Sequence, residues 1–415
     1  MNHSEKVDQD AVLRARTMLL ESGRPSLARQ VEAYRVLSAV SPLTYVPKLA
    51  DALVSYGYEP EVRDLPEARL ARHAEAAAVA RRVDEEDPRR TEVLVRALDA
   101  CQHGLYTLGR RAEGYAVCEE MAAAGHWGFE HGQVKSPGYG HGRLAVVLAE
   151  EGRYGEAAEV CGKSVEAERP LTPGGDSFWS VVEWVAALEA AGRRETALDA
   201  FAELVDVTRA KVAADSSALA IQVWQLVHLA RMLTTAGRQE EAVVVRQEAL
   251  GLLAELDLTG ERKSWSNILS WWVTLFALSG RPAEPVPTAQ APGPGFGVPC
   301  LEWSPDVREA YFEGLGPLEE HVAALREDPS TPLPDLIVQH RRLVVRTAVY
   351  RERRHHRILK PLRPLFDDRV ALARRLARPG VLGEALTDRA MFLVAAKQYG
   401  EAYDDFREAG ELLGR

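Results

Sequence analysis

The stretch GRQEEAVVVRQEAL (237–250) begins with a glycine and an arginine and continues with strong helix formers. Glycine adopts the left-handed backbone conformation that ends a preceding helix, and a glutamate early in the next helix suits the positive end of its dipole. Apolar residues recur with helical periodicity on both sides of this glycine. The stretch therefore predicts a helix, a tight turn and a second helix.

The same Gly-Arg motif occurs five times along the chain, in LGRRAEG (108–114), EGRYGEA (151–157), AGRRETA (191–197), AGRQEEA (236–242) and SGRPAEP (279–285). Its glycines are separated by 43, 40, 45 and 43 residues. A period of this length indicates an array of supersecondary units. Antiparallel helix pairs stack because each pair then buries a face that it could not bury alone. We therefore predict an all-α fold.

The residues around these turns resemble the tetratricopeptide repeat (TPR), in a long bacterial variety of about 42 residues. Bulky residues stand four positions before each glycine and alanines stand five positions after three of them, namely Leu105, Leu148, Leu188, Leu233, Phe276, Ala157, Ala197 and Ala242. Arg246 departs from the apolar residue expected nine positions after the glycine, and Trp184 and Trp272 precede valines where a small residue is expected. The resemblance implies a right-handed superhelix of stacked antiparallel helix pairs, a TPR-like α-solenoid.

The expected organisation has four parts. Residues 1–40 are predicted to form an N-terminal helical cap and residues 41–281 the repeat array. Six prolines and three glycines within 281–299 exclude a helix or a core strand, so 282–300 is interpreted as a linker or an extended strap. Residues 301–415 are expected to be a C-terminal helical region that ends in a further TPR-like repeat.

Composition limits the classes of function. A net charge of −10 and a pI near 5.7 argue against a general affinity for nucleic acid or an anionic membrane. Four cysteines without a CxxC pair, a polar N-terminus and a longest apolar run of only 11 residues predict a cytoplasmic protein. The 43 arginines against 8 lysines indicate a GC-rich genome, as in actinobacteria.

Sequence motifs of catalysis are absent: GxxxxGK[ST], HExxH, GxSxG and CxxC do not occur. The glycine-rich SPGYGHGR (136–143) lies between predicted helices, whereas phosphate-binding loops follow a strand, so it is interpreted as an inter-repeat loop. His126, His131 and His141 match no standard zinc spacing. Cys101, Cys118 and Cys161 occupy core positions. We expect no enzymatic activity, no cofactor and no metal.

The TPR resemblance also implies a binding surface. In that family, ligands lie along the concave groove formed by the first helix of each pair, chiefly thirteen, nine, six and three positions before the turn glycine. Here those positions hold Arg96, His103, Tyr106, Tyr139, Arg143, Trp179, Glu183, Trp224, His228, Arg231, Asn267 and Trp271. Exposed Trp, Tyr and Arg dominate interface energies. The alternative is that the tryptophans fill space between helices. We predict a non-catalytic scaffold or regulatory adaptor with a protein or peptide ligand in this groove.

A basic stretch suggests a second function. From His340 to Arg363 there are nine Lys or Arg and one acidic residue. The candidate basic patch comprises Arg341, Arg342, Arg346, Arg351, Arg353, Arg354, Arg357 and Lys360. Such a patch is typical of a nucleic-acid-associated regulator. The apolar residues between the arginines instead favour a packed helix whose outer side pairs with acidic residues. The sequence leaves open the oligomeric state and whether the C-terminal region or the linker covers the groove.

Overall fold

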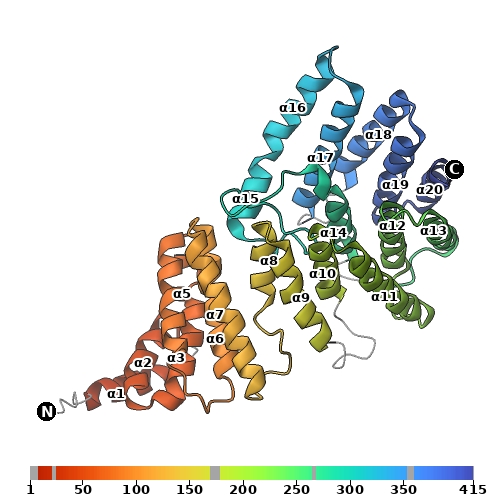
Figure 1. Ribbon diagram of the computed structural model, residues 1–415. Coiled ribbons are helices and arrows are strands. Elements are labelled where there is room, and N and C mark those ends of the chain that lie inside the picture. The colour runs from red at the N-terminus through yellow and green to blue at the C-terminus, as the bar shows by residue number, and fades with distance from the viewer. Residues whose placement is uncertain (1–7, 21–24, 169–177, 264–267, 353–358, 415) are drawn as a thin grey trace. The chain divides into compact units, whose positions relative to one another are not determined.

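The computed structural model describes residues 8–20, 25–168, 178–263, 268–352 and 359–414 (Figure 1). Every regular element within these ranges is helical, and consecutive helices pack in pairs. The predicted all-α class is confirmed. The chain divides into an N-terminal unit of Met1–Val147, Val160–Pro170 and Ser304–Asp306, and a C-terminal unit of Leu148–Glu159, Leu171–Trp303 and Val307–Arg415. No helix in the described ranges is long and apolar enough to cross a membrane.

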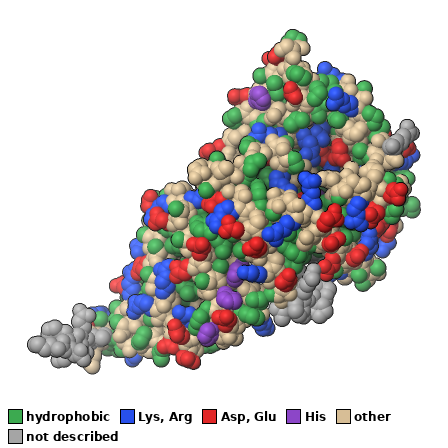
Figure 2. Space-filling view, in the orientation of Figure 1, with side chains coloured by type: hydrophobic (Ala, Val, Ile, Leu, Met, Phe, Trp, Pro, Cys, Tyr) green, Lys and Arg blue, Asp and Glu red, His purple; other side chains and the backbone are tan. Residues whose placement is uncertain are grey.

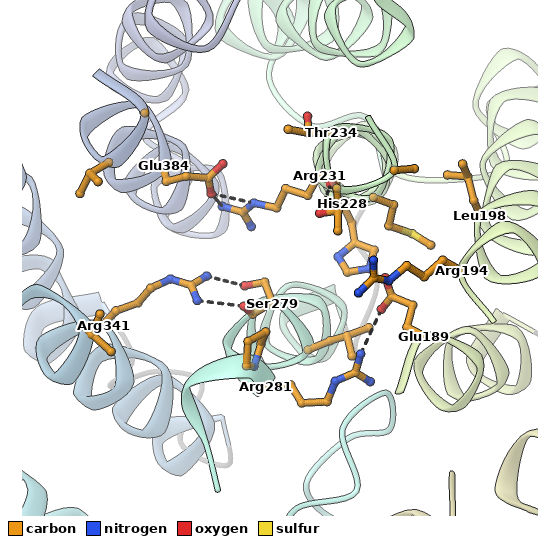
Figure 3. A pocket seen from close by; sticks show the side chains of 18 of the residues that line it. Glu189, Arg194, Leu198, His228, Arg231, Thr234, Ser279, Arg281, Arg341 and Glu384 are labelled. Atoms are coloured by element: carbon orange, nitrogen blue, oxygen red, sulfur yellow. Dashed lines mark hydrogen bonds and ion pairs between the residues drawn. The ribbon is translucent and has the colours of Figure 1, made fainter. Parts of the chain in front are cut away.

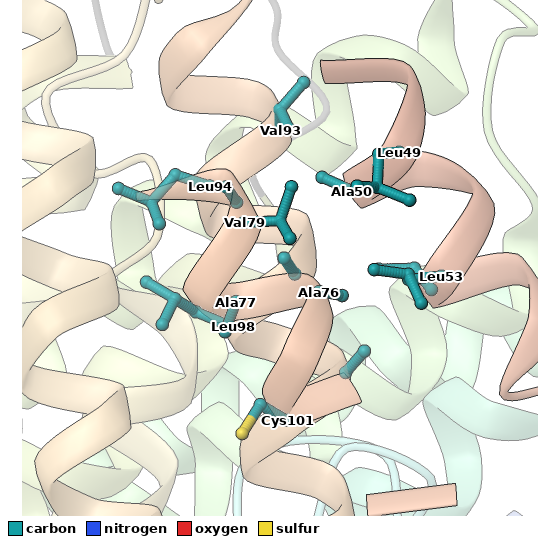
Figure 4. Close-up of a cluster of buried hydrophobic side chains, with 14 of the residues drawn as sticks. Leu49, Ala50, Leu53, Ala76, Ala77, Val79, Val93, Leu94, Leu98 and Cys101 are labelled. Atoms are coloured by element: carbon teal, nitrogen blue, oxygen red, sulfur yellow. The ribbon is translucent and has the colours of Figure 1, made fainter. Parts of the chain in front are cut away.

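The N-terminal unit contains the helices α1 (Gln9–Leu20), α2 (Leu27–Val40), α3 (Pro42–Tyr56), α4 (Pro60–Arg63), α5 (Pro66–Ala80), α6 (Arg90–Thr107) and α7 (Arg111–Glu130). Neighbouring helices pack on one another, except that α3 packs directly on α5 and the short α4 packs chiefly on α5. Its apolar core joins one face of α3, α5 and α6, with Leu53, Ala76 and Leu98 completely buried (Figure 4). Alanines at the crossing points allow the helices to approach closely, which accounts for the Ala-rich composition of α5.

The turn glycines have the backbone conformation that the repeat pattern predicts. Gly109, Gly152, Gly192 and Gly237 have φ between 68° and 78°, the left-handed region that a side chain disfavours. Gly280 departs from the pattern, because α14 (Ile268–Gly280) continues there into the 3-10 helix η1 (Arg281–Ala283) with φ of −87°. The described chain therefore reverses four times at glycines of this repeat.

A glycine within α7 permits a close approach of another segment. A Cβ atom at Gly125 would lie 1.7 Å from the carbonyl oxygen of Tyr139, a backbone atom that cannot rotate away. We expect Gly125→Ala to destabilise the N-terminal unit by about 1–3 kcal/mol, because the loop must shift away from α7. Gly251→Ala is the matched control, since a Cβ there meets nothing within 4 Å in an exposed helical position. Circular dichroism during urea unfolding measures both; equal midpoints for the two variants would contradict the packing.

The C-terminal unit contains most of the remaining helices: α10 (Phe178–Ala190), α11 (Arg194–Ala213), α12 (Leu219–Thr235), α13 (Gln239–Thr259), α14, η1, α16 (Leu315–Glu327), α17 (Leu333–Arg351), α18 (Leu359–Leu376), α19 (Pro379–Ala395) and α20 (Tyr399–Leu413). Three further helices, α8 (Gly142–Glu150), α9 (Tyr154–Glu168) and α15 (Pro305–Glu313), contain residues of both units.

The last helix pair of the C-terminal unit packs on a pair far away in the sequence. Helix α20 contacts α13 and α19 contacts α12, and the Trp224 indole donates a hydrogen bond of 3.2 Å to the carbonyl of Met391. An aromatic cluster of Trp272, Phe366 and Phe392 fills the space between α14, α18 and α19. The C-terminal helices α17 and α19 therefore cover part of the surface of α12 and α14.

The Pro- and Gly-rich segment has no helix or strand over 284–304 but is attached to its own unit. The Gly293 amide donates to the carbonyl of Glu150 at 2.9 Å, and the Trp303 indole donates to the carbonyl of Gly295 at 2.8 Å. Glu284 accepts hydrogen bonds from Arg342 and Arg346 on α17. These contacts fix the segment against neighbouring helices, so it is not a free spacer between domains.

Candidate binding cavity

A cavity of about 590 Å³ lies inside the C-terminal unit (Figure 3). Its wall is formed by α10, α11, α12, α14, η1, α17, α18 and α19. Exposed residues at its rim, Arg194, Thr235, Val338 and Gly380, show that it opens to solvent. Ligand-binding cavities in proteins have volumes of about 300–1,000 Å³. The cavity therefore has room for a small molecule or for a few residues of a peptide.

The cavity wall is rich in positive charge. Its charged residues are five arginines and two glutamates: Arg194, Arg231, Arg281, Arg341, Arg369, Glu189 and Glu384. His228 and Arg231 share one face of α12 because residues three apart are neighbours on a helix. We call this site the arginine-lined cavity.

Three of these arginines converge on one buried carboxylate. Asp388 of α19 is fully buried and lies 2.6 Å from Arg231, 3.0 Å from Arg369 and 3.2 Å from Arg341. Burial opposes ionisation of Asp388, but the positive charges of Arg341, Arg231 and Arg369 outweigh it and hold its pKa well below the usual range. The carboxylate therefore stays ionised and fixes the three guanidinium groups on one side of the cavity.

The other polar groups of the wall form local pairs, as Figure 3 shows. Arg231 lies 3.1 Å from Glu384, and Arg341 donates to the backbone carbonyl and the hydroxyl of Ser279 at 2.8 and 2.9 Å. Arg281 donates to a carbonyl of α10 and lies 3.5 Å from Glu189. Burial raises the pKa of Glu189 and lowers that of Arg281. These contacts hold the charged groups at fixed places around an open centre.

Two buried groups in the wall retain unused hydrogen-bonding capacity. The imidazole of His228 is 6% exposed, and neither of its nitrogens has a hydrogen-bond partner among the described residues. Burial, together with the charges of Arg231 and Arg281, lowers its pKa to about 3, so the ring is neutral at pH 7. Arg369 is 4% exposed, and its Nε and Nη1 likewise lack partners in the described chain. Unpaired buried polar groups of this kind are destabilising unless another molecule supplies the missing partner.

Two of the groove residues predicted in this unit, His228 and Arg231, line the cavity. Trp224 is buried at 3% exposure beneath α19, and Trp271, at 6%, stacks on the half-buried Trp179 with ring centroids 4.4 Å apart. These contacts favour the packing interpretation of the tryptophans. Glu183 is half-buried and does not line the cavity. Asn267 lies outside the described residues.

The other predicted groove residues belong to the N-terminal unit and do not line this cavity. Arg96 is exposed and lies 3.1 Å from Asp51, and Arg143 lies 3.3 Å from Asp99. Tyr106 is completely buried, which makes it a core residue. The remaining two, His103 and Tyr139, are half-buried.

Most residues of the cavity wall are not among the binding residues predicted from the sequence. Arg281 follows Gly280 and Arg194 stands two positions after Gly192, so the repeated Gly-Arg motif was the available signal. Glu189 stands at the end of the preceding helix. Arg369 and Glu384 come from α18 and α19, whose position against α12 no local pattern indicates.

The arginines of the predicted basic patch that the structure describes are engaged inside the unit. Arg341 belongs to the cavity, while Arg342 and Arg346 pair with Glu284, whose side chain is 4% exposed. Arg346 also lies over the Tyr311 ring, 4.5 Å from its centroid. This pairing favours the packed-helix interpretation and lends no support to nucleic-acid binding. Acidic and basic side chains are interspersed on the face that Figure 2 shows.

The rest of the predicted basic patch adds little. Arg351 lies 5.7 Å from the centre of the Tyr350 ring, and Lys360 is exposed. Arg353, Arg354 and Arg357 lie outside the described residues. All four cysteines are buried, and no group of His, Cys, Asp and Glu in the described ranges is arranged to hold a metal ion.

Comparisons with models of known protein families and with curated proteins found no match. The structure thus defines a class, an all-helical protein with consecutively paired helices, and the TPR resemblance depends on the sequence pattern.

Proposed function

We propose that the chain is a non-catalytic binding protein, a scaffold or regulatory adaptor of the TPR-like α-solenoid type, that takes a protein or peptide segment into the arginine-lined cavity. The observation that carries this proposal is the wall of five arginines facing only two glutamates around an open volume of about 590 Å³. Guanidinium groups bind carboxylates and other oxyanions with defined geometry. The favoured ligand segment is therefore acidic.

The structural setting supports binding better than catalysis. The described acidic groups of the wall are held in ion pairs with arginines, and His228 is neutral without a carboxylate to orient it. General acid–base catalysis needs a titratable group whose pKa is near the working pH and that reaches the reacting proton. Fixed, charged donors around an open volume instead suit the recognition of an anionic ligand. The packing of α19–α20 on α12–α13 supports the stacked-pair architecture.

Selection from a random peptide display library tests the proposal, because it requires no identified partner. We expect selection on the purified protein to enrich peptides with acidic residues. Arg194→Glu should weaken capture of these peptides about tenfold or more, because it reverses a charge at the exposed rim. The fold should tolerate this change, since Arg194 is exposed and acts on Glu189 through its charge, without a close ion pair among the described residues.

Arg193→Glu is the matched control. Arg193 is the neighbouring exposed residue of the same turn and lies near Glu159 instead of the cavity. Capture should stay within about twofold of the wild type after this change, because only distant, screened charge is altered. Equal losses in the two variants, or enriched peptides with no excess of acidic residues, would contradict binding at the cavity.

A further inference from the structure

Glu384 differs from the other carboxylate that neutralises the same arginines. Its side chain is 41% exposed, lines the cavity and contacts Arg231 alone at 3.1 Å. Asp388, one helical turn further along α19, is 0% exposed and contacts three arginines. Removing Asp388 from these contacts would disrupt the buried cluster, whereas Glu384 rotates into solvent at the cost of one partly exposed ion pair.

The charges of the wall do not balance while Glu384 is in place. Five arginines face Glu189 and Glu384, and Asp388 behind the wall supplies a third negative charge, which leaves two positive charges without a counter-ion. Arg246 of α13 is 7% exposed and adds a further buried positive charge close to Arg231. The unused nitrogens of Arg369 and His228 lie in the same wall. The excess positive charge fits a ligand with more than one negative charge, and the unused nitrogens fit a ligand with oxygen acceptors.

We infer that the arginine-lined cavity selects a group with two negative charges, and that this group displaces Glu384 from Arg231 when it binds. The inference rests on the proposed function. It specifies the charge of the ligand group and identifies Glu384 as the side chain of the protein that competes with this ligand for Arg231. Paired carboxylates and a phosphomonoester share this chemistry. Glu384 then acts as a built-in counter-ion that lowers affinity for singly charged ligands, because such a ligand only restores the charge that Glu384 supplied, whereas a dianion also neutralises one of the remaining positive charges.

Isothermal titration calorimetry at constant ionic strength tests the inference with simple probes. The dianionic probes are succinate and phenyl phosphate, their singly charged analogues are succinamate and methyl phenyl phosphate, and succinamide is the neutral control. We expect both dianions to bind about threefold to tenfold more tightly to Glu384→Gln and Glu384→Ala than to the wild type, because the competing carboxylate is gone. The singly charged analogues should bind more weakly than the dianions to each protein, and equal affinities of the wild type for both kinds of probe would overturn the inference. The neutral control should bind to none of the proteins. The dianion that binds with the higher affinity shows whether the cavity prefers paired carboxylates or a phosphomonoester.

Glu401→Gln is the matched control, since Glu401 is a half-exposed glutamate of the same unit that pairs with Arg363 at 2.8 Å away from the cavity. Its affinity for the probes should equal that of the wild type. Unchanged or weaker binding of dianions to both Glu384 variants, with folding intact by tryptophan fluorescence, overturns the inference. Library peptides whose capture depends on Arg194 and not on Glu384 would overturn it too, while leaving the proposed function standing. Tighter binding of the dianions to the variants, with no peptide selected, supports the inference and contradicts the proposed peptide partner.

Discussion

Replacing Asp388 by asparagine is expected to lower the free energy of unfolding of the C-terminal unit by about 3–5 kcal/mol. The substitution keeps the size of the side chain and removes the charge that Arg231, Arg341 and Arg369 share at 2.6 to 3.2 Å. Three guanidinium groups then remain close together, and Arg369, buried at 4% exposure, loses the one carboxylate within ion-pair distance of it in the described chain. Urea unfolding followed by tryptophan fluorescence measures the effect, because seven of the eight tryptophans belong to this unit.

Asp404→Asn serves as the control for Asp388→Asn. Asp404 also pairs with an arginine, Arg407, at 3.1 Å, but its side chain is 70% exposed. Exposed ion pairs contribute at most about 1 kcal/mol, so the midpoint should barely move. A loss below about 1 kcal/mol for Asp388→Asn would show that the buried cluster does not hold the C-terminal helices in place.

Acidification from pH 6.5 to pH 4.5 is expected to destabilise the C-terminal unit by about 5 kcal/mol through two buried histidines. Burial, with Arg231 and Arg281 nearby, lowers the pKa of His228 to about 3. Burial also lowers the pKa of His340 to about 4, although Asp368 at 2.9 Å favours its charged form. An unfolded histidine titrates near pH 6.5, so the unfolded chain binds more protons below that pH and stability falls as pH falls. Each histidine contributes about 1.4 kcal/mol per pH unit.

Free energies of unfolding measured at a series of pH values give the slope of stability against pH. His228→Asn and His340→Asn should each remove about half of the slope between pH 6.5 and 4.5, whatever they do to stability at pH 7. His321→Asn should leave it unchanged, because this histidine is exposed on α16 in the folded chain. Wild-type stability that is flat over this interval would contradict neutral, buried imidazoles. Below pH 4 the contribution of His340 fades, because the folded chain also protonates this ring, while Asp388 begins to contribute, because its lowered pKa makes stability fall as acid protonates the unfolded carboxyl.

The helices and their turns could be predicted from the sequence because the signal is local. A glycine in the left-handed region at 109, 152, 192 and 237 ends one helix, and a few residues decide where the next begins. Lys397, between α19 and α20, has φ of 58° and makes the same turn without a glycine. Arg246, the one departure from the apolar positions, is buried and donates to the Thr234 hydroxyl at 2.7 Å. The arginine at this otherwise apolar position is therefore explained by a hydrogen bond to the preceding helix of the same pair.

The cavity could be predicted only in part because its walls come from distant segments. The register of α12 placed His228 and Arg231 on one face correctly, and both line the cavity. Trp224 lies on α12 as well, yet it is covered by α19, whose Met391 follows 167 residues later. No periodicity in the repeats specifies which later helix returns to cover them. The same return supplies Asp388 and Glu384, so the partners of Arg231 could not be inferred from its neighbours in the sequence.

The central claim is that an anionic ligand occupies the arginine-lined cavity, and the most direct measurement is the NMR spectrum of ¹⁵N-histidine-labelled protein titrated with a selected acidic peptide. His228→Asn assigns the ring signal of the one histidine in the cavity wall. We expect this signal to shift in proportion to bound peptide, while that of His126, exposed in the N-terminal unit, stays in place. A peptide that binds fully and leaves the His228 signal unmoved would contradict the claim.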